Sequence, residues 1–168
     1  MISVAHGAEY RKCGVVFFTG TEEIPCPICQ GKLRVHGTCM RKLRSSEGRV
    51  LYRLRVMECR KCGKTHRELP LGIVPYKRMD ADLLSDIAET PQQSHLEVAE
   101  TSTWRRVWAW VRWFIQYSLN ILTAMQAEYP GILTGLPGGP LRRQLTYFVR
   151  LVVNSGNWVQ HRSALTST

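Results

Sequence analysis

Acidic residues are scarce in one part of this 168-residue chain. Between Lys32 and Arg67 there are 12 Lys and Arg residues but only two acids, Glu47 and Glu58. The rest of the chain has 11 bases and 11 acids, so the whole net charge of +10 lies in that stretch. A basic surface without counter-charges indicates a polyanionic partner, first a nucleic acid and second an anionic membrane surface.

The chain also lacks an uninterrupted apolar run. Its most apolar stretch, residues 104–125, contains Arg105, Arg106 and Arg112, and three arginines inside a membrane span would be very costly. The first 25 residues show no basic start followed by an apolar run, so we expect no secretory signal. The sequence therefore predicts a cytoplasmic protein with no membrane partner.

Carboxylates are nearly absent from the C-terminal part. Glu128 is the single acid after Arg112. Two-metal phosphoryl transfer needs a set of carboxylates, and the second half of the chain cannot supply one. We therefore expect no enzymatic activity.

Four of the six cysteines stand at metal-binding spacing, in the pairs Cys26-Pro-Ile-Cys29 and Cys59-Arg-Lys-Cys62. A Cys-x-x-Cys turn directs two sulfurs at one ion, and two such turns complete a tetrahedral Cys₄ site. In a reducing compartment this reading is favoured over disulfides. The spacing predicts one structural Zn²⁺ with no open coordination position. The alternative is a set of buried free cysteines.

Cys13, Cys39 and His66 stand outside this set. A lone cysteine is most often a small buried hydrophobic residue. His66 follows Cys62 by four residues and could replace a cysteine ligand, although four cysteines already complete the site.

The segment between the pairs predicts a basic β-hairpin, with strands over 33–35, 40–44 and 50–58 and a turn over 45–48. In the last strand one face is apolar, and Arg53 and Arg55 fall on the other, about 7 Å apart. The facing strand adds Arg41, Lys42 and Arg44. This spacing resembles that of successive phosphates, so we expect contacts with a DNA backbone. The alternative is a charged edge that prevents strand aggregation.

The second half predicts helices. A Pro- and Gly-rich linker covers residues 68–76, and Asp80 can cap the helix that follows. A capping box over 94–97 predicts a short helix to about residue 100, and a polar turn over 101–103 precedes a longer basic helix. This order is typical of a helix-turn-helix over about 80–118. The alternative is a plain helical bundle.

Three residues lie near the N-terminus of the expected recognition helix and are predicted to contact DNA: Thr103, Arg105 and Arg106. Helical spacing places Trp104 and Trp108 on its inward stripe. Trp110 and Trp113 then form a second face for the C-terminal helix, expected over 141–153, or for a partner protein.

Together these patterns predict an α+β chain in which an N-terminal zinc ribbon, with β-hairpins and a Cys₄ site, precedes an all-helical, helix-turn-helix-like domain. The zinc-ribbon domain, with an N-terminal extension and the Pro-rich linker, is expected over residues 1–78. The helical domain, with the C-terminal helix, is expected over residues 79–168.

Several motifs also resemble a known family, namely Cys26-Pro-Ile-Cys29, Tyr52-Arg-Leu-Arg55, Cys59-Arg-Lys-Cys62 and Ile73-Val-Pro-Tyr-Lys77. They look like uncharacterised bacterial zinc-ribbon and helix-turn-helix proteins that are encoded in mobile elements, often beside a transposase gene. The ribbon is also similar to the N-terminal DNA-binding region of insertion-sequence transposases.

The resemblance implies a zinc-dependent, non-enzymatic protein of a mobile genetic element that binds double-stranded DNA at the bacterial nucleoid. It would recruit or regulate a separately encoded transposase or integrase. Two other functions stay open: an RNA- or ribosome-associated zinc-ribbon module, and a protein-interaction adaptor that uses the Trp-rich helix. A preference for duplex or single strand separates the first from DNA binding, and the adaptor would show no salt-sensitive nucleic-acid binding.

Overall fold

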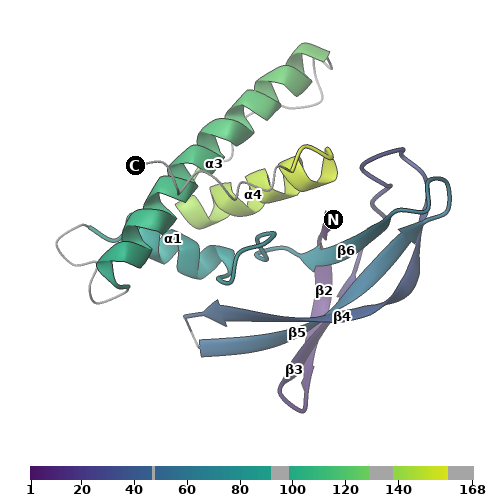
Figure 1. The fold of residues 1–168 in the computed structure, drawn as a ribbon, viewed down its shortest axis with the longest axis horizontal. Coiled ribbons are helices and arrows are strands. Elements are labelled where there is room, and N and C mark those ends of the chain that lie inside the picture. The colour runs from purple at the N-terminus through teal and green to yellow at the C-terminus, as the bar shows by residue number, and fades with distance from the viewer. Residues whose placement is uncertain (47, 92–98, 129–137, 159–168) are drawn as a thin grey trace.

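The computed structural model describes residues 1–46, 48–91, 99–128 and 138–158. The strands of this part are β1 (Ile2–Val4), β2 (His6–Lys12), β3 (Val15–Gly20), β4 (Leu33–Ser45), β5 (Gly48–Cys59) and β6 (Thr65–Pro70). Its helices are α1 (Ala81–Glu89), α3 (Thr101–Glu128) and α4 (Leu141–Asn154). In Figure 1 the strands form one curled sheet, and the helices gather on one side of it.

The sheet is mixed and centred on β5. One edge of β5 pairs antiparallel with β4 along its whole length. The other edge is shared, because β3 runs parallel to residues 51–53 and β6 runs antiparallel to residues 56–58. β2 extends the sheet beyond β3, and β1 lies parallel to β6. The hairpin with the basic residues is therefore part of a larger sheet.

The predicted β4–β5 hairpin and its turn are confirmed, with Ser45 paired to Gly48. The two short strands expected over 33–35 and 40–44 are one strand, with an irregularity between Val35 and Gly37. One face of the hairpin contributes Leu43 and Leu54 to a buried cluster within the sheet, whose other members are Ile2, Val4, Phe18, Leu69 and Ile73.

The helices form the second core. Asp80 caps α1 as predicted, because its Oδ1 accepts a hydrogen bond from the Leu83 backbone N–H at 2.8 Å. α4 agrees with the helix expected over 141–153. Buried side chains of α1, α3 and α4 pack together around Phe114 and Phe148.

Helix α3 differs from its prediction. It begins at Thr101, so residues 101–103 belong to its first turn, and it continues for 28 residues. Its buried stripe uses Trp110, which is 7% exposed, whereas Trp108 is 37% exposed. The placement of these two tryptophans is therefore the reverse of the predicted one. The short helix expected over 94–100 falls largely on residues 92–98, outside the described residues.

The predicted fold class is wrong. Residues 1–20, which carry no sequence motif, supply three strands of the sheet, so the N-terminal part is larger than a zinc ribbon. The helices do not form a separate helix-turn-helix-like layer, because α4 is fastened to the sheet. The Asn154 amide accepts from the Ser3 N–H and donates to the Ser3 carbonyl, both at 2.8 Å. Arg150 donates to Glu22 at 2.6 Å. The molecule is a mixed, sheet-rich fold with mostly C-terminal helices packed against the sheet.

No helix among the described residues could cross a membrane. None of these helices combines the length and the apolar character needed to cross a bilayer.

Candidate metal centre

The two Cys-x-x-Cys segments fold into the same turn. In each, the first cysteine donates its backbone N–H to the carbonyl five residues later, at 2.9 Å for both Cys26 and Cys59. Its own carbonyl accepts from the N–H four residues later, at 2.8 Å and 2.9 Å. The residue after the second cysteine is left-handed in both turns, Gln30 with φ 57° and Gly63 with φ 68°. We call these two turns the knuckles.

The knuckles bring all four predicted ligand sulfurs together. The Sγ atoms of Cys29 and Cys59 lie 3.4 Å apart, and those of Cys26 and Cys62 lie 3.7 Å apart. All four lie within 4.8 Å of one another. A tetrahedron of sulfurs about 2.3 Å from a central zinc has edges of about 3.8 Å. The residues therefore fit a tetrahedral metal ion.

The sulfurs differ in how readily they lose a proton. The pKa of Cys59 is lowered to about 6, because the backbone N–H of Cys62, and with it that of Lys61, donates to its sulfur. The backbone N–H of Gly31 favours the thiolate of Cys29, but burial and the neighbouring sulfurs outweigh it and raise its pKa to about 12. Four adjacent thiolates repel one another, and a bound divalent cation would offset that repulsion.

Gly31 is required by the close approach of the knuckles. A Cβ at this position would lie 2.9 Å from the Cys59 sulfur and 2.7 Å from the Cβ of Lys61. Ordinary carbon contacts are about 3.5–4 Å. A side chain here would therefore push the two cysteine pairs apart.

His66 lies beside the four sulfurs and outside the tetrahedron. Its side chain is buried, and its Nε2 lies 3.3 Å from the Cys26 sulfur. Burial lowers the pKa of the imidazole. A neutral imidazole with its proton on Nε2 can donate to the Cys26 thiolate, as outer partners of metal ligands commonly do. In the sequence, the spacing of four residues between Cys62 and His66 already indicates that this histidine lies near the cysteines.

The two remaining cysteines differ from each other. Cys39 is half-buried against the sheet cluster, in keeping with a hydrophobic role. Cys13 is exposed at the turn between β2 and β3, with φ 50°, so the buried position expected for it is wrong.

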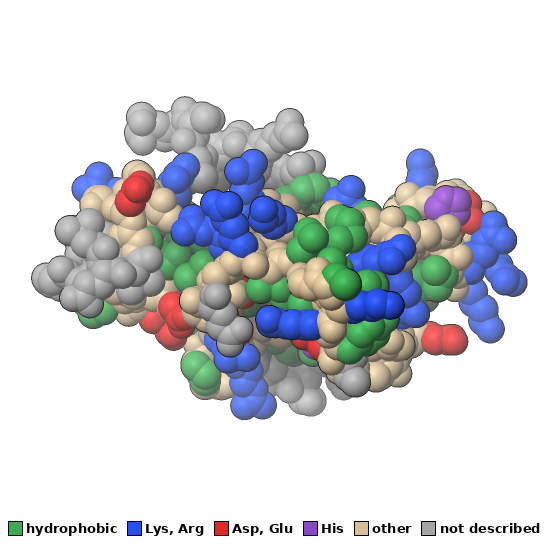
Figure 2. All heavy atoms as spheres, turned by 90° about the horizontal axis from the view of Figure 1, so that it is seen from below, with side chains coloured by type: hydrophobic (Ala, Val, Ile, Leu, Met, Phe, Trp, Pro, Cys, Tyr) green, Lys and Arg blue, Asp and Glu red, His purple; other side chains and the backbone are tan. Residues whose placement is uncertain are grey.

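One face of the sheet gathers basic and aromatic side chains from four neighbouring strands. Paired residues of neighbouring strands point to the same face, and alternate residues along a strand share a face. By this register the face opposite Leu43 and Leu54 includes Arg55, which is paired with Glu68 of β6. The other members of the face are Tyr10, Lys12, Val15, Phe17, Met40, Lys42, Arg44, Arg49, Leu51 and Arg53. We call this the outer sheet face. Figure 2 shows Lys and Arg side chains over the sheet, with hydrophobic ones between them.

The structure divides the predicted DNA contacts between several places. Lys42, Arg44 and Arg53 lie on the outer sheet face. Arg41 lies on the opposite face of β4, where its Nη2 donates to the carbonyls of Val74 at 2.6 Å and Lys77 at 2.9 Å. Arg41 therefore holds the segment that leads to α1.

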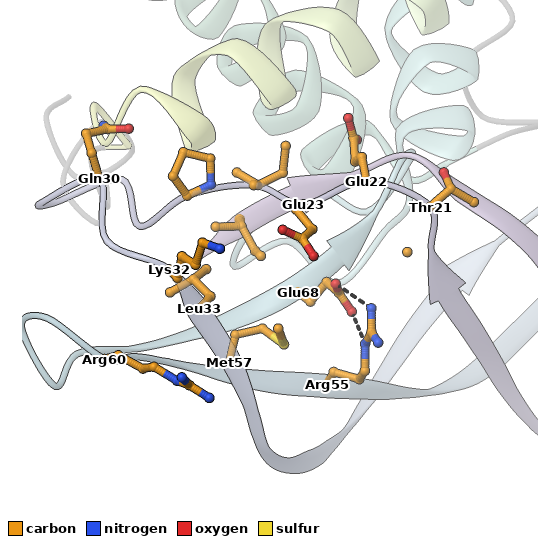
Figure 3. Close-up of a pocket in the computed structure, with 14 residues that line it drawn as sticks. Thr21, Glu22, Glu23, Gln30, Lys32, Leu33, Arg55, Met57, Arg60 and Glu68 are labelled. Atoms are coloured by element: carbon orange, nitrogen blue, oxygen red, sulfur yellow. Dashed lines mark hydrogen bonds and ion pairs between the residues drawn. The ribbon is translucent and has the colours of Figure 1, made fainter.

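Arg55 forms a paired contact with a buried carboxylate. Its Nε and Nη2 donate to the two oxygens of Glu68 at 2.5 Å and 2.7 Å, and Glu68 is 2% exposed. Figure 3 shows this pair in a pocket of about 740 Å³, with Lys32 and Arg60 toward the knuckles. Glu22 and Glu23 also line the pocket, so its acids balance its bases. A lining without excess positive charge does not favour the binding of a polyanion.

The other three predicted contacts lie on α3. Arg105 and Arg106 are exposed near its start, and Arg106 Nε donates to the Ser102 carbonyl at 3.3 Å. Thr103 and Arg106 line an apolar hollow of about 190 Å³ whose wall includes Trp110. The structure therefore does not bring the eight predicted residues to one surface.

Tyr10 and Phe17 are the functional candidates that sequence reasoning missed. Their rings stack with centroids 4.9 Å apart and planes 5° apart. Residues 15–18 are apolar and could be recognised as a strand from the sequence. Which face Phe17 occupies follows only from the pairing of β3 with β5.

One family model matches part of the chain. It is described as a domain of unknown function (DUF6431) and covers residues 26–108, a range that includes both cysteine pairs. No curated protein and no solved structure matches the chain. The family description names no function, so the mobile-element context stays a prediction from the resemblance of the motifs.

Proposed function

We propose that the protein is a non-enzymatic, zinc-stabilised nucleic-acid-binding protein that contacts phosphates through the outer sheet face. The observation that carries this proposal is the charge of that face. Apart from Arg55, whose charge is paired with Glu68, it presents five cations, Lys12, Lys42, Arg44, Arg49 and Arg53. The two acids that the structure describes in these strands, Glu9 and Glu58, alternate onto the other face.

Zinc is the metal that the donor set favours. Thiolates are soft ligands, and four of them in a tetrahedron are typical of structural zinc. Four thiolates and Zn²⁺ sum to about −2, and the bases around the knuckles are placed to offset this charge. Four protein ligands leave no position for a substrate, so the ion's part is to hold the two knuckles together.

The spacing of the cations suits a phosphate backbone. Neighbouring strands lie about 4.8 Å apart, and same-face residues along a strand lie about 7 Å apart, a distance close to that of successive phosphates. The proposal does not use Thr103, Arg105 and Arg106 as a recognition helix, because that role depended on the helix-turn-helix fold. A role beside a transposase or integrase rests on the motif resemblance, and the genes that flank this one test it.

The test is binding of a labelled oligonucleotide over a series of salt concentrations. Each phosphate contact releases counterions, so the logarithm of affinity should fall linearly with the logarithm of salt. Arg44 and Arg49 are paired across the hairpin. The double substitution Arg44→Ala with Arg49→Ala should lower affinity for every sequence and flatten the salt slope by about 1 per lost contact.

Arg143→Ala is the control, because Arg143 is an exposed arginine on α4 and is not part of the outer sheet face. It removes one charge and should leave the slope nearly unchanged. Affinity that is equal at low and physiological salt, or equal losses in the control and the double variant, would contradict the proposed function.

A further inference from the structure

We propose that the outer sheet face binds a single-stranded nucleic acid and stacks a base on Tyr10. The inference rests on the proposed function and names the form of nucleic acid that this face takes. Its basis is that flat rings and cations occupy the same surface.

The rings form a layered stack. Tyr10 and Phe17 are paired across β2 and β3, with nearly parallel rings 4.9 Å apart. The Arg53 guanidinium lies over Phe17, 5.8 Å from the ring centre. Tyr10 is 57% exposed, so much of its side chain is open to solvent. A nucleobase can continue this stack on the exposed side of Tyr10, because every base has a flat π-face.

The cations flank the row that holds the rings. Lys12 is two residues from Tyr10 on the same face of β2, and Lys42 ends the cross-strand row of Lys12 on β4, with Arg44 two residues further along that strand. Met40, which is 52% exposed, lies next to Arg53 in the strand pairing and adds an adaptable apolar contact. Stacking rings beside a basic track are the combination that single-strand binders use.

A duplex fits this surface less well. The face spans four strands, so its outer strands lie about 14 Å apart before side chains are added. The major groove is about 12 Å wide and admits a two-stranded ribbon or a helix. A duplex could touch the cations with its phosphates, but its bases are already stacked on one another and would leave Tyr10 unused.

A second copy of the chain is also a poorer occupant. Two outer sheet faces would bring ten cations together besides the two Arg55–Glu68 pairs, whose charges are already balanced. Like charges directly opposite one another are destabilising. The charge of the face therefore selects a polyanion, and the rings select one with accessible bases.

The experiment measures affinity of the full zinc-loaded chain for a labelled oligothymidylate of 12 nucleotides and for a duplex of equal length, in the same salt series. The wild-type chain should prefer the single strand. Tyr10→Ala should weaken single-strand binding about 5- to 100-fold, the range expected for one stacked base. Its salt slope should not change, because stacking releases no counterions.

Tyr10→Phe is the matched control, because it keeps the ring and removes the hydroxyl. It should bind within about twofold of the wild-type chain if stacking is the contact. A 5-iodouracil strand should also cross-link to Tyr10, as mapped by mass spectrometry. These results together support the inference.

Three outcomes overturn it. Equal affinity for both forms with no effect of Tyr10→Ala would remove the single-strand inference and leave the proposed function in place. No salt-sensitive binding of either form would remove both. A Tyr10→Ala change in sedimentation without a change in binding would show that this face contacts a second copy instead.

Discussion

Gly31 shows how one residue decides whether the two cysteine pairs can share an ion. A Cβ there would lie 2.9 Å from the Cys59 sulfur. Gly31→Ala should therefore loosen the tetrahedron and weaken zinc binding by about 10- to 100-fold, the size of effect seen when the surroundings of metal ligands are altered. The measurement is zinc transfer to a chromophoric chelator, after metal analysis has given near one zinc per wild-type chain.

Two further variants define the range of this assay. Gly37→Ala is the control, because nothing lies within 4 Å of the added Cβ, and it should keep its zinc. Cys59→Ser removes a ligand and should lose zinc together with the folding of the knuckles. A folded Cys59→Ser protein that still holds one zinc, or a wild-type protein that folds without metal, would contradict the proposed centre.

The cluster of four cysteines could be predicted from the sequence because its determinants are local. Each Cys-x-x-Cys turn is fixed within six residues, so the spacing alone indicates the geometry. The roles of Arg41 and Arg55 could not be predicted in this way. Their partners, the Val74 carbonyl and the Glu68 carboxylate, depend on how distant segments pack.

Among the elements, α3 shows how a helix chooses the face that it buries. Its stripe includes Trp104, Val107, Trp110 and Phe114, and Lys77 Nζ lies 4.1 Å from the centre of the Trp110 ring. Trp110→Ala would empty a filled site in the core, so it should lower the free energy of unfolding by about 3–5 kcal/mol. Urea denaturation followed by far-ultraviolet circular dichroism measures this loss.

Trp108→Ala is the internal comparison on the same helix. Trp108 is 37% exposed and loses its stacking on Trp104, at 5.9 Å between centroids, and the contact with the Arg112 guanidinium, 4.5 Å from its ring centre, so the cost should be about 1–2 kcal/mol. If Trp108→Ala lowered the free energy of unfolding more than Trp110→Ala, the buried face would be the one that the sequence predicts, with Trp108 inward.

Elements with local signals could be predicted, and elements fixed by distant pairing could not. Asp80 marks the start of α1, and the basic hairpin has alternating residues on both sides of a turn. By contrast, β1 has three residues and exists because it pairs with β6, more than 60 residues away. Because β1, β2 and β3 are not predicted, the sequence indicates only a small zinc ribbon. The helices are then interpreted as a separate domain.

At the scale of the whole molecule, the helices and the metal centre meet at the end of α4. A Cβ on Gly156 would lie 2.6 Å from the carbonyl oxygen of Pro27, which stands between two ligand cysteines. Asn154 is bonded to β1 immediately before this point. The turn after α4 therefore rests directly on the first knuckle, and we expect loss of order in one to disturb the other.

The distribution of tryptophan makes this dependence measurable. All five tryptophans lie between residues 104 and 158, in the helical half, whereas the four cysteines of the cluster lie between residues 26 and 62, in the knuckles that precede β4 and follow β5. Trp158 contacts Phe114 at 5.4 Å between ring centroids, close behind Gly156 in the chain. Removal of zinc by a strong chelator should therefore shift the tryptophan emission to longer wavelength and lower the melting temperature of the helices along with that of the sheet.

The boundary predicted at residue 78 leads to the opposite expectation. Independent domains 1–78 and 79–168 would leave the tryptophan emission unchanged when the metal is removed, and thermal unfolding would show two transitions. Chelator saturated with zinc beforehand is the control for direct effects of the reagent. Gly156→Ala should partly uncouple the halves, because its Cβ meets the Pro27 carbonyl and its φ of 78° is unfavourable for alanine. If the tryptophan emission of the wild-type protein stayed unchanged after complete loss of zinc, the contact of Gly156 with Pro27 would not couple the folding of the helices to the metal centre.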